Sequence, residues 1–196
     1  MEIKNYSLSF GNRQLADQFN VAFSREKLNV VIGANGAGKT SFLDFVAGVG
    51  SKNASGTKVD MPKMADIAYQ LQHIHFFPTL TVAQTVGMYA RLGSESSQMT
   101  SDTFTTIKRE VLSKIWHTKM GQLSGGEQQI VLTYGQCLLD RHLYIFDEPT
   151  SGVDATNAEI ILQMINDLIV RHQKVVVMTS HHLEQLKEFD VNLIQL

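Results

Sequence analysis

The residues best suited to chemistry begin with a glycine-rich segment, Gly33-Ala34-Asn35-Gly36-Ala37-Gly38-Lys39-Thr40. It follows a short apolar run and precedes apolar residues at helical spacing, so it joins a strand to a helix. Glycines let the backbone curl so that successive N–H groups face phosphate oxygens, and the following helix adds its positive end. Lys39 supplies an ammonium for the β- and γ-phosphates, and the Thr40 hydroxyl is a magnesium ligand. A glycine turn without function is the alternative, but the context favours a phosphate site.

Two carboxylates follow another apolar run, Leu143-Tyr144-Ile145-Phe146. A buried strand delivers such groups to its carboxyl edge, which is where α/β sheets bind ligands. Asp147 is then placed to bind magnesium, and Glu148 to hold or deprotonate an attacking water molecule. An exposed acidic turn is the alternative, and the glycine-rich segment makes the catalytic interpretation the preferred one.

A third candidate is the segment Leu123-Ser124-Gly125-Gly126-Glu127. Two glycines at a helix start free backbone N–H groups for an anion, and the Ser124 hydroxyl adds a donor. Taken alone, the segment also fits a capping box, with Ser124 as the N-cap and Glu127 at the third helical position. Its place upstream of the acidic pair favours the anion-binding interpretation.

The elements that must position these groups can be placed from apolar periodicity. Apolar residues alternate with polar ones from Ile3 to Phe10 and from Phe19 to Phe23, with a turn at Gly11-Asn12 between them. Buried strands are predicted over Leu28–Ile32, Leu143–Phe146 and Lys174–Met178. Helices are predicted after the glycine-rich segment and over Glu127–Leu139, Asn157–Arg171 and His182–Phe189.

Strands that alternate with helices indicate an α/β fold with a mainly parallel sheet, preceded here by an N-terminal antiparallel β portion. The middle of the chain differs. The stretch Gly93–Thr106 is rich in Ser and Thr, and we predict a loop there that ends near a helix start at Ser101 or Asp102. The helix that follows carries an apolar stripe formed by Ile107, Val111, Leu112 and Ile115. We expect one domain over residues 1–196, with a core of about 1–72 and 124–196 and an inserted helical lobe of about 73–123.

The composition is that of a globular chain. It has 196 residues, 43% of them hydrophobic, and its 17 Lys and Arg against 19 Asp and Glu give a net charge of −2. This balance does not suggest a polybasic binder of nucleic acid or lipid. A single cysteine, Cys137, cannot form an internal disulfide, and we expect it to be packed. No signal peptide and no membrane-spanning run is evident, so a partner would have to cross any membrane that the protein serves.

Taken together, the motifs resemble those of the ATP-binding cassette (ABC) ATPases, and the resemblance covers essentially the whole chain. It implies a P-loop NTPase core in which Gly33–Thr40 is the Walker A motif and Leu123–Glu127 the signature motif. The signature motif would contact the γ-phosphate of ATP held by the other subunit of a head-to-tail dimer. Gln72 matches the glutamine that touches magnesium and senses the transmembrane partner, and is preferred to Gln70 because of the segment Phe77–Val82 that follows.

The resemblance also implies roles for several further residues. Ser151-Gly152-Val153-Asp154 looks like the segment that couples the two ATP sites, His181 like the histidine that hydrogen-bonds the γ-phosphate, and Phe10 like an aromatic that stacks on adenine. Magnesium would be held by Thr40, Gln72 and Asp147, and catalysis would use Lys39, Gln72, Glu148 and His181. Nucleotide would be bound by Phe10, Gly33, Asn35, Gly36, Ala37, Gly38, Lys39, Thr40, Ser41, Ser124, Gly125, Gly126 and Asp154.

Some residues depart from the family pattern or favour a structural interpretation. Glu127 stands where Gln is commonest, Ile130 and Gly135 where Arg is frequent, and His182 where Asp is frequent. His73 and His75 lie in a predicted loop without a cysteine pair, so a structural metal is not expected. Trp116 and Phe104 are predicted to pack in the core or the lobe, with contact to a partner as the alternative. For the pair Phe76-Phe77, packing in the lobe and contact with a membrane subunit are equally favoured alternatives.

The function expected from the resemblance is ATP hydrolysis that drives transport. The partners would be ATP, magnesium, a second nucleotide-binding subunit (identical or homologous) and a separate transmembrane permease subunit, with no nucleic acid. The location would be cytoplasmic, peripheral on the inner face of the cell membrane. The alternatives are a soluble ABC ATPase that remodels a non-transport partner, and a nucleotide-gated module without turnover. The intact Lys39, Asp147, Glu148 and His181 argue against the second.

Overall fold

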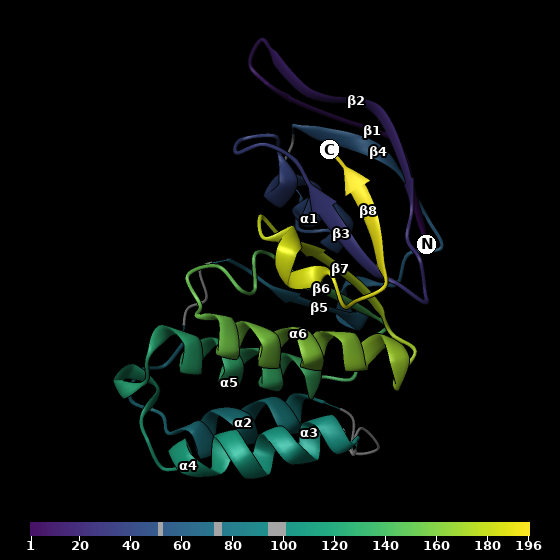
Figure 1. Ribbon diagram of the computed structural model, residues 1–196. Coiled ribbons are helices and arrows are strands. Elements are labelled where there is room, and N and C mark those ends of the chain that lie inside the picture. Colours follow the sequence, from purple (N-terminus) through teal and green to yellow (C-terminus); the bar gives the residue numbers. More distant parts are fainter. Residues whose placement is uncertain (51–52, 73–75, 94–100) are drawn as a thin grey trace.

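Two β-sheets and two groups of helices are stacked in layers in the computed structural model, which describes residues 1–50, 53–72, 76–93 and 101–196 (Figure 1). The smaller sheet is antiparallel, in the order β2-β1-β4. Its strands are β1 (Glu2–Phe10), β2 (Arg13–Ala22) and β4 (Ala54–Val59). A tight turn at Gly11, with a φ of 57° that suits glycine, joins β1 to β2 and forms a hairpin.

The larger sheet has five parallel strands in the order β5-β6-β7-β3-β8. They are β5 (Ile67–Gln70), β6 (Leu143–Phe146), β7 (Val175–Thr179), β3 (Leu28–Ile32) and β8 (Val191–Gln195). The middle strands β6, β7 and β3 are mostly apolar and are buried along nearly their whole length because both faces of the sheet are covered. In β6, Leu143 and Ile145 pack on one side of the sheet, and Tyr144 and Phe146 pack on the other.

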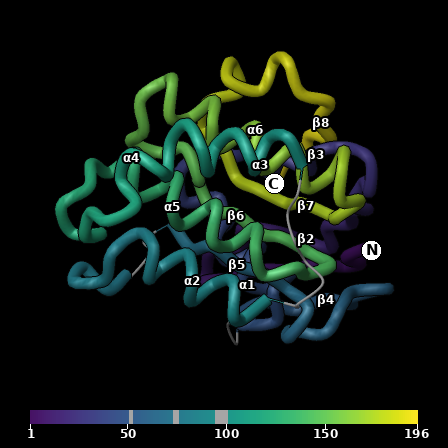
Figure 2. The backbone as a smooth tube through the Cα atoms, turned by 90° about the horizontal axis from the view of Figure 1, so that it is seen from below, coloured from purple at the N-terminus to yellow at the C-terminus, as the bar shows by residue number. Residues whose placement is uncertain are grey.

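Helix α1 (Lys39–Ala47) lies between the two sheets, where its Phe42 ring meets the Tyr6 ring of β1 with centroids 5.0 Å apart. Helices α5 (Gly125–Cys137) and α6 (Ala155–Val170) cover the opposite face of the parallel sheet (Figures 1 and 2). The phosphate-loop helix and the helix that follows the signature motif are therefore on opposite sides of one sheet.

The middle of the chain forms a helical layer against α5. It contains α2 (Val82–Leu92), α3 (Asp102–Ile107), a π-helical turn (Lys108–Leu112) and α4 (Ser113–Ile115), and short 3-10 helices lie at Met64–Asp66, Met120–Gln122 and Leu183–Leu186. Helix α2 approaches α5 closely because Gly135 has no side chain. A Cβ atom there would overlap the Tyr89 ring of α2.

The fold agrees with the predicted α/β class, and the strands predicted at Leu28–Ile32 and Leu143–Phe146 are confirmed. Other bounds differ. Strand β2 is longer than the predicted run because it pairs with β1 from Arg13 onward, α6 starts at Ala155 because Asp154 caps it, and residues 182–189 hold only a 3-10 turn. Strands β4, β5 and β8 were not predicted. Among the described helices, none combines the length and the apolar character that crossing a membrane requires.

Candidate nucleotide-binding site

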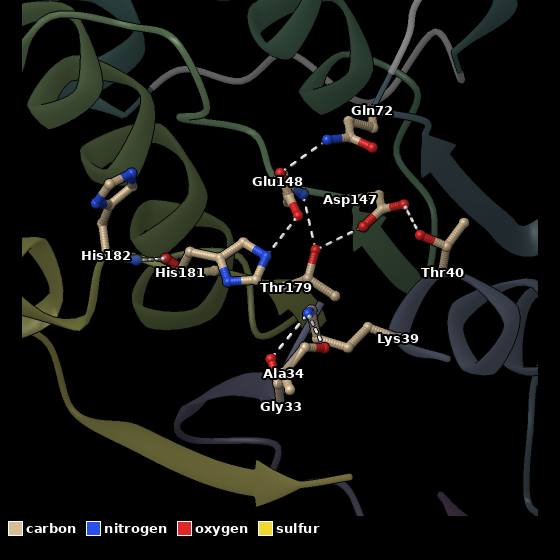
Figure 3. A network of polar contacts seen from close by, with 11 residues as sticks. Gly33, Ala34, Lys39, Thr40, Gln72, Asp147, Glu148, Thr179, His181 and His182 are labelled. Carbon is tan, nitrogen blue, oxygen red and sulfur yellow. Dashed lines mark hydrogen bonds and ion pairs between the residues drawn. The ribbon is translucent and has the colours of Figure 1, made fainter. Parts of the chain in front are cut away.

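The candidate site lies at the carboxyl edge of the parallel sheet, where four neighbouring strands end. Gln72 follows β5, Asp147 and Glu148 follow β6, His181 follows β7, and the glycine-rich loop follows β3 (Figure 3). Residues far apart in the sequence meet there because parallel strands present their carboxyl ends at one edge.

A cavity of about 700 Å³ opens at this edge. Its volume falls within the range of small-molecule sites, about 300–1,000 Å³. Its walls come from the β1–β2 hairpin, the glycine-rich loop with the start of α1, and the ends of β5, β6 and β7. The lining residues are Phe10, Arg13, Leu15, Asn35, Gly36, Gly38, Lys39, Thr40, Ser41, Gln72, Glu148 and His181.

The glycine-rich loop needs glycine at two positions for conformational reasons. Gly36 and Gly38 have φ angles of 77° and 98°, in the left-handed region. Gly38 is also the N-cap of α1 and forms no side-chain cap, so the first backbone N–H groups of the helix have no capping side chain. Such a helix start suits an anion, and the loop is therefore shaped for phosphate.

Lys39 lies inside this loop with most of its side chain buried. Its Nζ donates hydrogen bonds to the carbonyl oxygens of Gly33 (2.9 Å) and Ala34 (3.1 Å) (Figure 3). Because Lys39 also lines the cavity, the ammonium is held at the cavity wall by backbone oxygens. Two further residues support the loop. The Gly33 carbonyl accepts the hydrogen bond from Lys39, and the Ala37 N–H donates a hydrogen bond to the Ala34 carbonyl (3.1 Å).

A chain of hydrogen bonds joins Thr40, Asp147 and Thr179. The Thr40 hydroxyl donates to Asp147 Oδ2 (2.8 Å), and the Thr179 hydroxyl donates to Asp147 Oδ1 (2.6 Å). Asp147 is 3% exposed, and these two donors satisfy one oxygen each of its buried carboxylate. The adjacent hydroxyl and carboxylate are hard oxygen ligands of the kind that magnesium prefers, so these two residues fit a Mg²⁺ ion.

Glu148 is held from three directions. His181 Nε2 lies 2.9 Å from Glu148 Oε1, Gln72 Nε2 donates to Oε2 (2.8 Å), and the Glu148 N–H donates to the Thr179 hydroxyl (2.8 Å) (Figure 3). Its backbone φ is 50°, a left-handed value that is unusual for a residue with a side chain. Such a conformation persists where the surroundings fix it, and here the three contacts fix the carboxylate at the cavity.

The two candidate glutamines have different surroundings. Gln72 is exposed at the cavity and bonds to Glu148, whereas Gln70 is buried and bonds to the Thr133 hydroxyl of α5 (3.2 Å). The choice of Gln72 over Gln70 thus agrees with where the side chains lie. Gln72 contacts Glu148 and not the Thr40–Asp147 pair.

The signature segment, Leu123–Glu127, does not reach this cavity. Ser124 caps α5, and its N–H and hydroxyl both donate to Glu127 Oε2 (2.8 and 2.9 Å), which completes the predicted capping box. Ser124 and Gly125 are exposed, and Gly126 faces Asn157 of α6. Asp154 is also exposed and caps α6 through the Asn157 N–H (3.1 Å). None of these residues lines the cavity.

The remaining residues of interest pack as structure. Cys137 is buried, and burial raises the pKa of its thiol. Phe104 and Ile130 are in the core, and Trp116 packs against it. Phe76 also packs on the core, whereas Phe77 is 64% exposed. His73 and His75 lie outside the described residues. Within the part that the structure describes, no cluster of three or more possible metal ligands occurs.

Sequence reasoning missed two kinds of residue at the site. Thr179 links Asp147 to Glu148, and the only signal for it was its place at the end of an apolar strand. Arg13 and Leu15 line the cavity from β2, and the turn at Gly11-Asn12 could have indicated that this strand returns beside Phe10.

Comparison with known proteins finds relatives among the ABC transporters. The family model for ABC transporters matches residues 16–151. The zinc import ATP-binding protein ZnuC of Photorhabdus laumondii is 30% identical over 181 residues, which cover 92% of this chain and 68% of that protein. The ABC transporter G family member 8 of Arabidopsis thaliana is 31% identical over 159 residues, which cover 77% of this chain but only 27% of the plant protein.

Solved structures show the same fold. A dimeric ATP-binding cassette in a post-hydrolysis state with ADP and Pi matches with a TM-score of 0.78 and 20% identity, covering 100% of this chain and 93% of that one. A nucleotide-free ATP-binding cassette from an ABC transporter matches with a TM-score of 0.74 and 17% identity, covering 99% and 88%.

Proposed function

Because the chain belongs to the ABC transporter family of ATP-binding ATPases, we propose that it is an ATP-hydrolysing subunit that dimerises around two MgATP molecules and drives a separate transmembrane subunit. The observation that carries this proposal is the position of Glu148. Its carboxylate is fixed by Gln72 and His181 at a cavity whose other wall holds Lys39. This arrangement supports Glu148 as the base that acts beside the groups suited to bind phosphate.

The cavity accounts for each part of a nucleotide. The Phe10 ring, 45% exposed on the hairpin, offers an apolar face for a base. The loop from Gly33 to Ser41 offers backbone N–H groups and the Lys39 ammonium to the phosphates. Thr40 and Asp147 would hold Mg²⁺, which neutralises developing charge on the phosphoryl group when it is bound. Gln72, which lines the same cavity, would complete this set.

Hydrolysis then assigns one task to each residue. Glu148 accepts a proton from the attacking water while the water oxygen bonds to the γ-phosphorus. The bond from that phosphorus to the leaving ADP oxygen breaks. Gln72 and His181 keep the carboxylate in position, and Lys39 stabilises the charge on the transferring group. Thr179 positions both Asp147 and Glu148.

The exposed signature segment supports the dimer. Ser124 and Gly125 form the start of a 13-residue helix and face solvent, away from the chain's own cavity. A helix start with a hydroxyl donor is suited to phosphate, so its ligand would be the γ-phosphate held by a second subunit. Asp154 is exposed and bonds to Asn157, and Asn157 also contacts Gly126 of the signature segment. Asp154 therefore lies near that segment and would couple the two sites.

The outer side of the helical layer offers a surface for a membrane subunit. Phe77 is 64% exposed, and Met88 and Leu92 of α2 are 37% and 59% exposed. Phe77 lies close in sequence to Gln72, so a partner bound there could sense the nucleotide site. The protein would then be peripheral on the inner face of the membrane, held by that partner.

The test uses a variant that traps ATP. Glu148→Gln keeps the hydrogen-bonding shape but removes the base, so turnover should fall by about 10²–10⁴-fold while ATP drives a dimer. Light scattering coupled to size exclusion would measure the dimer, and phosphate release the turnover. Adding Ser124→Arg should return the trapped protein to the monomer with nearly unchanged nucleotide affinity. Hydrolysis at the parent rate by Glu148→Gln would show that the base is wrongly assigned.

A further inference from the structure

The tip of the β1–β2 hairpin brings a second side chain to the cavity beside Phe10. Phe10 and Arg13 are direct partners in the antiparallel register across the turn. Directly opposed residues in an antiparallel pair project from the same face of the hairpin. Both residues line the cavity, so an aromatic ring and a guanidinium stand next to each other at one end of it.

The base of this hairpin is fixed to the phosphate loop. A Cβ atom on Gly38 would lie 2.6 Å from Leu8 Cδ2 of β1 and 3.5 Å from Leu15 Cδ1 of β2, so both strands pack directly on that glycine. Arg13 is two residues from Leu15, a step of about 7 Å along a strand. The hairpin therefore holds Arg13 beside Phe10, one two-residue step beyond the point where its strands pack on the phosphate loop.

The charge of Arg13 is not taken up by a neighbouring carboxylate. Across the described part of the chain, its guanidinium forms no ion pair, whereas Lys4, Lys27 and Arg109 pair with carboxylates. Arg141, by comparison, donates to the carbonyl oxygens of Leu139 and Leu92. The Arg13 side chain is exposed at the cavity and free to meet an anion there.

We propose that Arg13 is a nucleotide-binding residue whose guanidinium contacts the α-phosphate, the phosphate next to the ribose. This inference rests on the proposed function, because it concerns the same nucleotide. With the base on Phe10 and the outer phosphates at Lys39, the α-phosphate lies between the two ends, and the long Arg13 side chain extends into the same cavity from beside Phe10. A guanidinium is suited to phosphate because it presents paired N–H donors and remains charged.

The test compares Arg13→Gln with the matched control Arg25→Gln. Arg25 is an exposed arginine that does not line the cavity, so its replacement removes the same charge elsewhere. Titration of monomeric protein with ATP, ADP and adenosine would give the dissociation constants. Arg13→Gln should weaken ATP and ADP binding to a similar extent, by about 5- to 20-fold, as expected for a charge-assisted bond at a partly exposed site. Adenosine binding and the thermal midpoint should not change.

A conservative variant and a salt series sharpen the assignment. Arg13→Lys keeps the charge but loses the paired donors, so its ATP affinity should fall between that of the parent and that of Arg13→Gln. The dependence of ATP affinity on salt should be weaker for Arg13→Gln than for Arg25→Gln, because one charge contact with the ligand is lost.

Several outcomes would overturn the inference, and they are separable from failure of the proposed function. Equal ATP affinities for Arg13→Gln and Arg25→Gln would exclude a contact with nucleotide while leaving the ATPase proposal intact. Adenosine binding weakened as much as ATP binding would place Arg13 on the base and not on a phosphate. A parent protein that binds no ATP, or binds it equally well as Lys39→Ala, would overturn both.

Discussion

The nucleotide cavity and the signature segment are both proposed to bind phosphate, but they are held together differently. At the cavity, Asp147, Glu148, Thr179 and His181 bond to one another across β6 and β7, and Thr40 and Gln72 join them from α1 and β5. In the signature segment, Ser124 bonds to Glu127 and Gln128, three and four residues along the same helix. The geometry of the cavity depends on tertiary structure, whereas the geometry of the signature segment depends on the start of one helix.

This difference separates two kinds of preorganisation. The carboxylates of Asp147 and Glu148 are fixed before any ligand arrives, because side chains from other elements already bond to them. The signature segment is fixed only as a helix end, and its exposed donors have no partner from another element among the described residues. A change at the cavity should therefore affect folding and chemistry together, whereas a change at the signature segment should mainly affect association.

The largest effect is expected from Thr179→Val. Thr179 is fully buried, and valine has its shape but neither donates to Asp147 nor accepts from the Glu148 N–H. Two buried polar groups then lose a partner, so the free energy of unfolding should fall by about 2–4 kcal/mol. ATP turnover should fall at least tenfold, because the Asp147 carboxylate loses a donor and the Glu148 backbone loses its acceptor.

Denaturant unfolding and phosphate release would measure these two losses, and Thr179→Ser, which keeps the hydroxyl, is the control. A Val variant as stable and active as the Ser variant would mean that the Thr179 bonds contribute nothing at this site.

The matched change in the other region is Ser124→Ala, which also removes one hydroxyl. Its cost to folding should be that of an exposed N-cap, about 1 kcal/mol. Nucleotide affinity of the monomer should stay at the parent value, while ATP-dependent dimerisation weakens. Unfolding and light scattering on the same samples give both quantities. A loss of stability equal to that of Thr179→Val would remove the contrast between the two regions.

The smallest effect is expected from Glu127→Gln. The Glu127 carboxylate accepts two bonds from Ser124, and its charge lies beside the place proposed for a partner's γ-phosphate. Glutamine keeps the capping shape, so stability should fall only by about 0.3–1 kcal/mol through the helix dipole. ATP-dependent dimerisation should tighten a few-fold as the like charge is removed. Weaker dimerisation would show that the carboxylate assists closure.

The same contrast explains what the sequence could predict. The loop Gly33–Thr40, the acidic pair after β6 and the capping box at Ser124 are local patterns whose geometry depends on residues close in the chain, and all three occur where expected. Thr179 depends on the register that pairs Phe146 with Met178 across two strands, and Arg13 on the register that pairs it with Phe10. The first register is not written in the local pattern of residue types, and the second is indicated only by the turn at Gly11-Asn12.

Fold prediction succeeded and failed for related reasons. The core strands β3, β6 and β7 are mostly apolar and can be recognised from the sequence. Strand β4 is mostly exposed and contains Gly56, so its residues lack the strand pattern. The four-residue β5 is too short to show a period. Its place at the edge of the parallel sheet follows only from pairing with β6.

The close approach of α2 to α5 has a mechanical consequence. The Tyr89 ring lies against the bare backbone at Gly135, so no compressible side chain separates the two helices. Dense packing of this kind transmits displacement with little slack. A displacement of α2 toward α5 should therefore displace α5 as well. The contact at Gly135 is near the carboxyl end of α5, and Ser124 caps the opposite end, so the displacement would reach the signature segment.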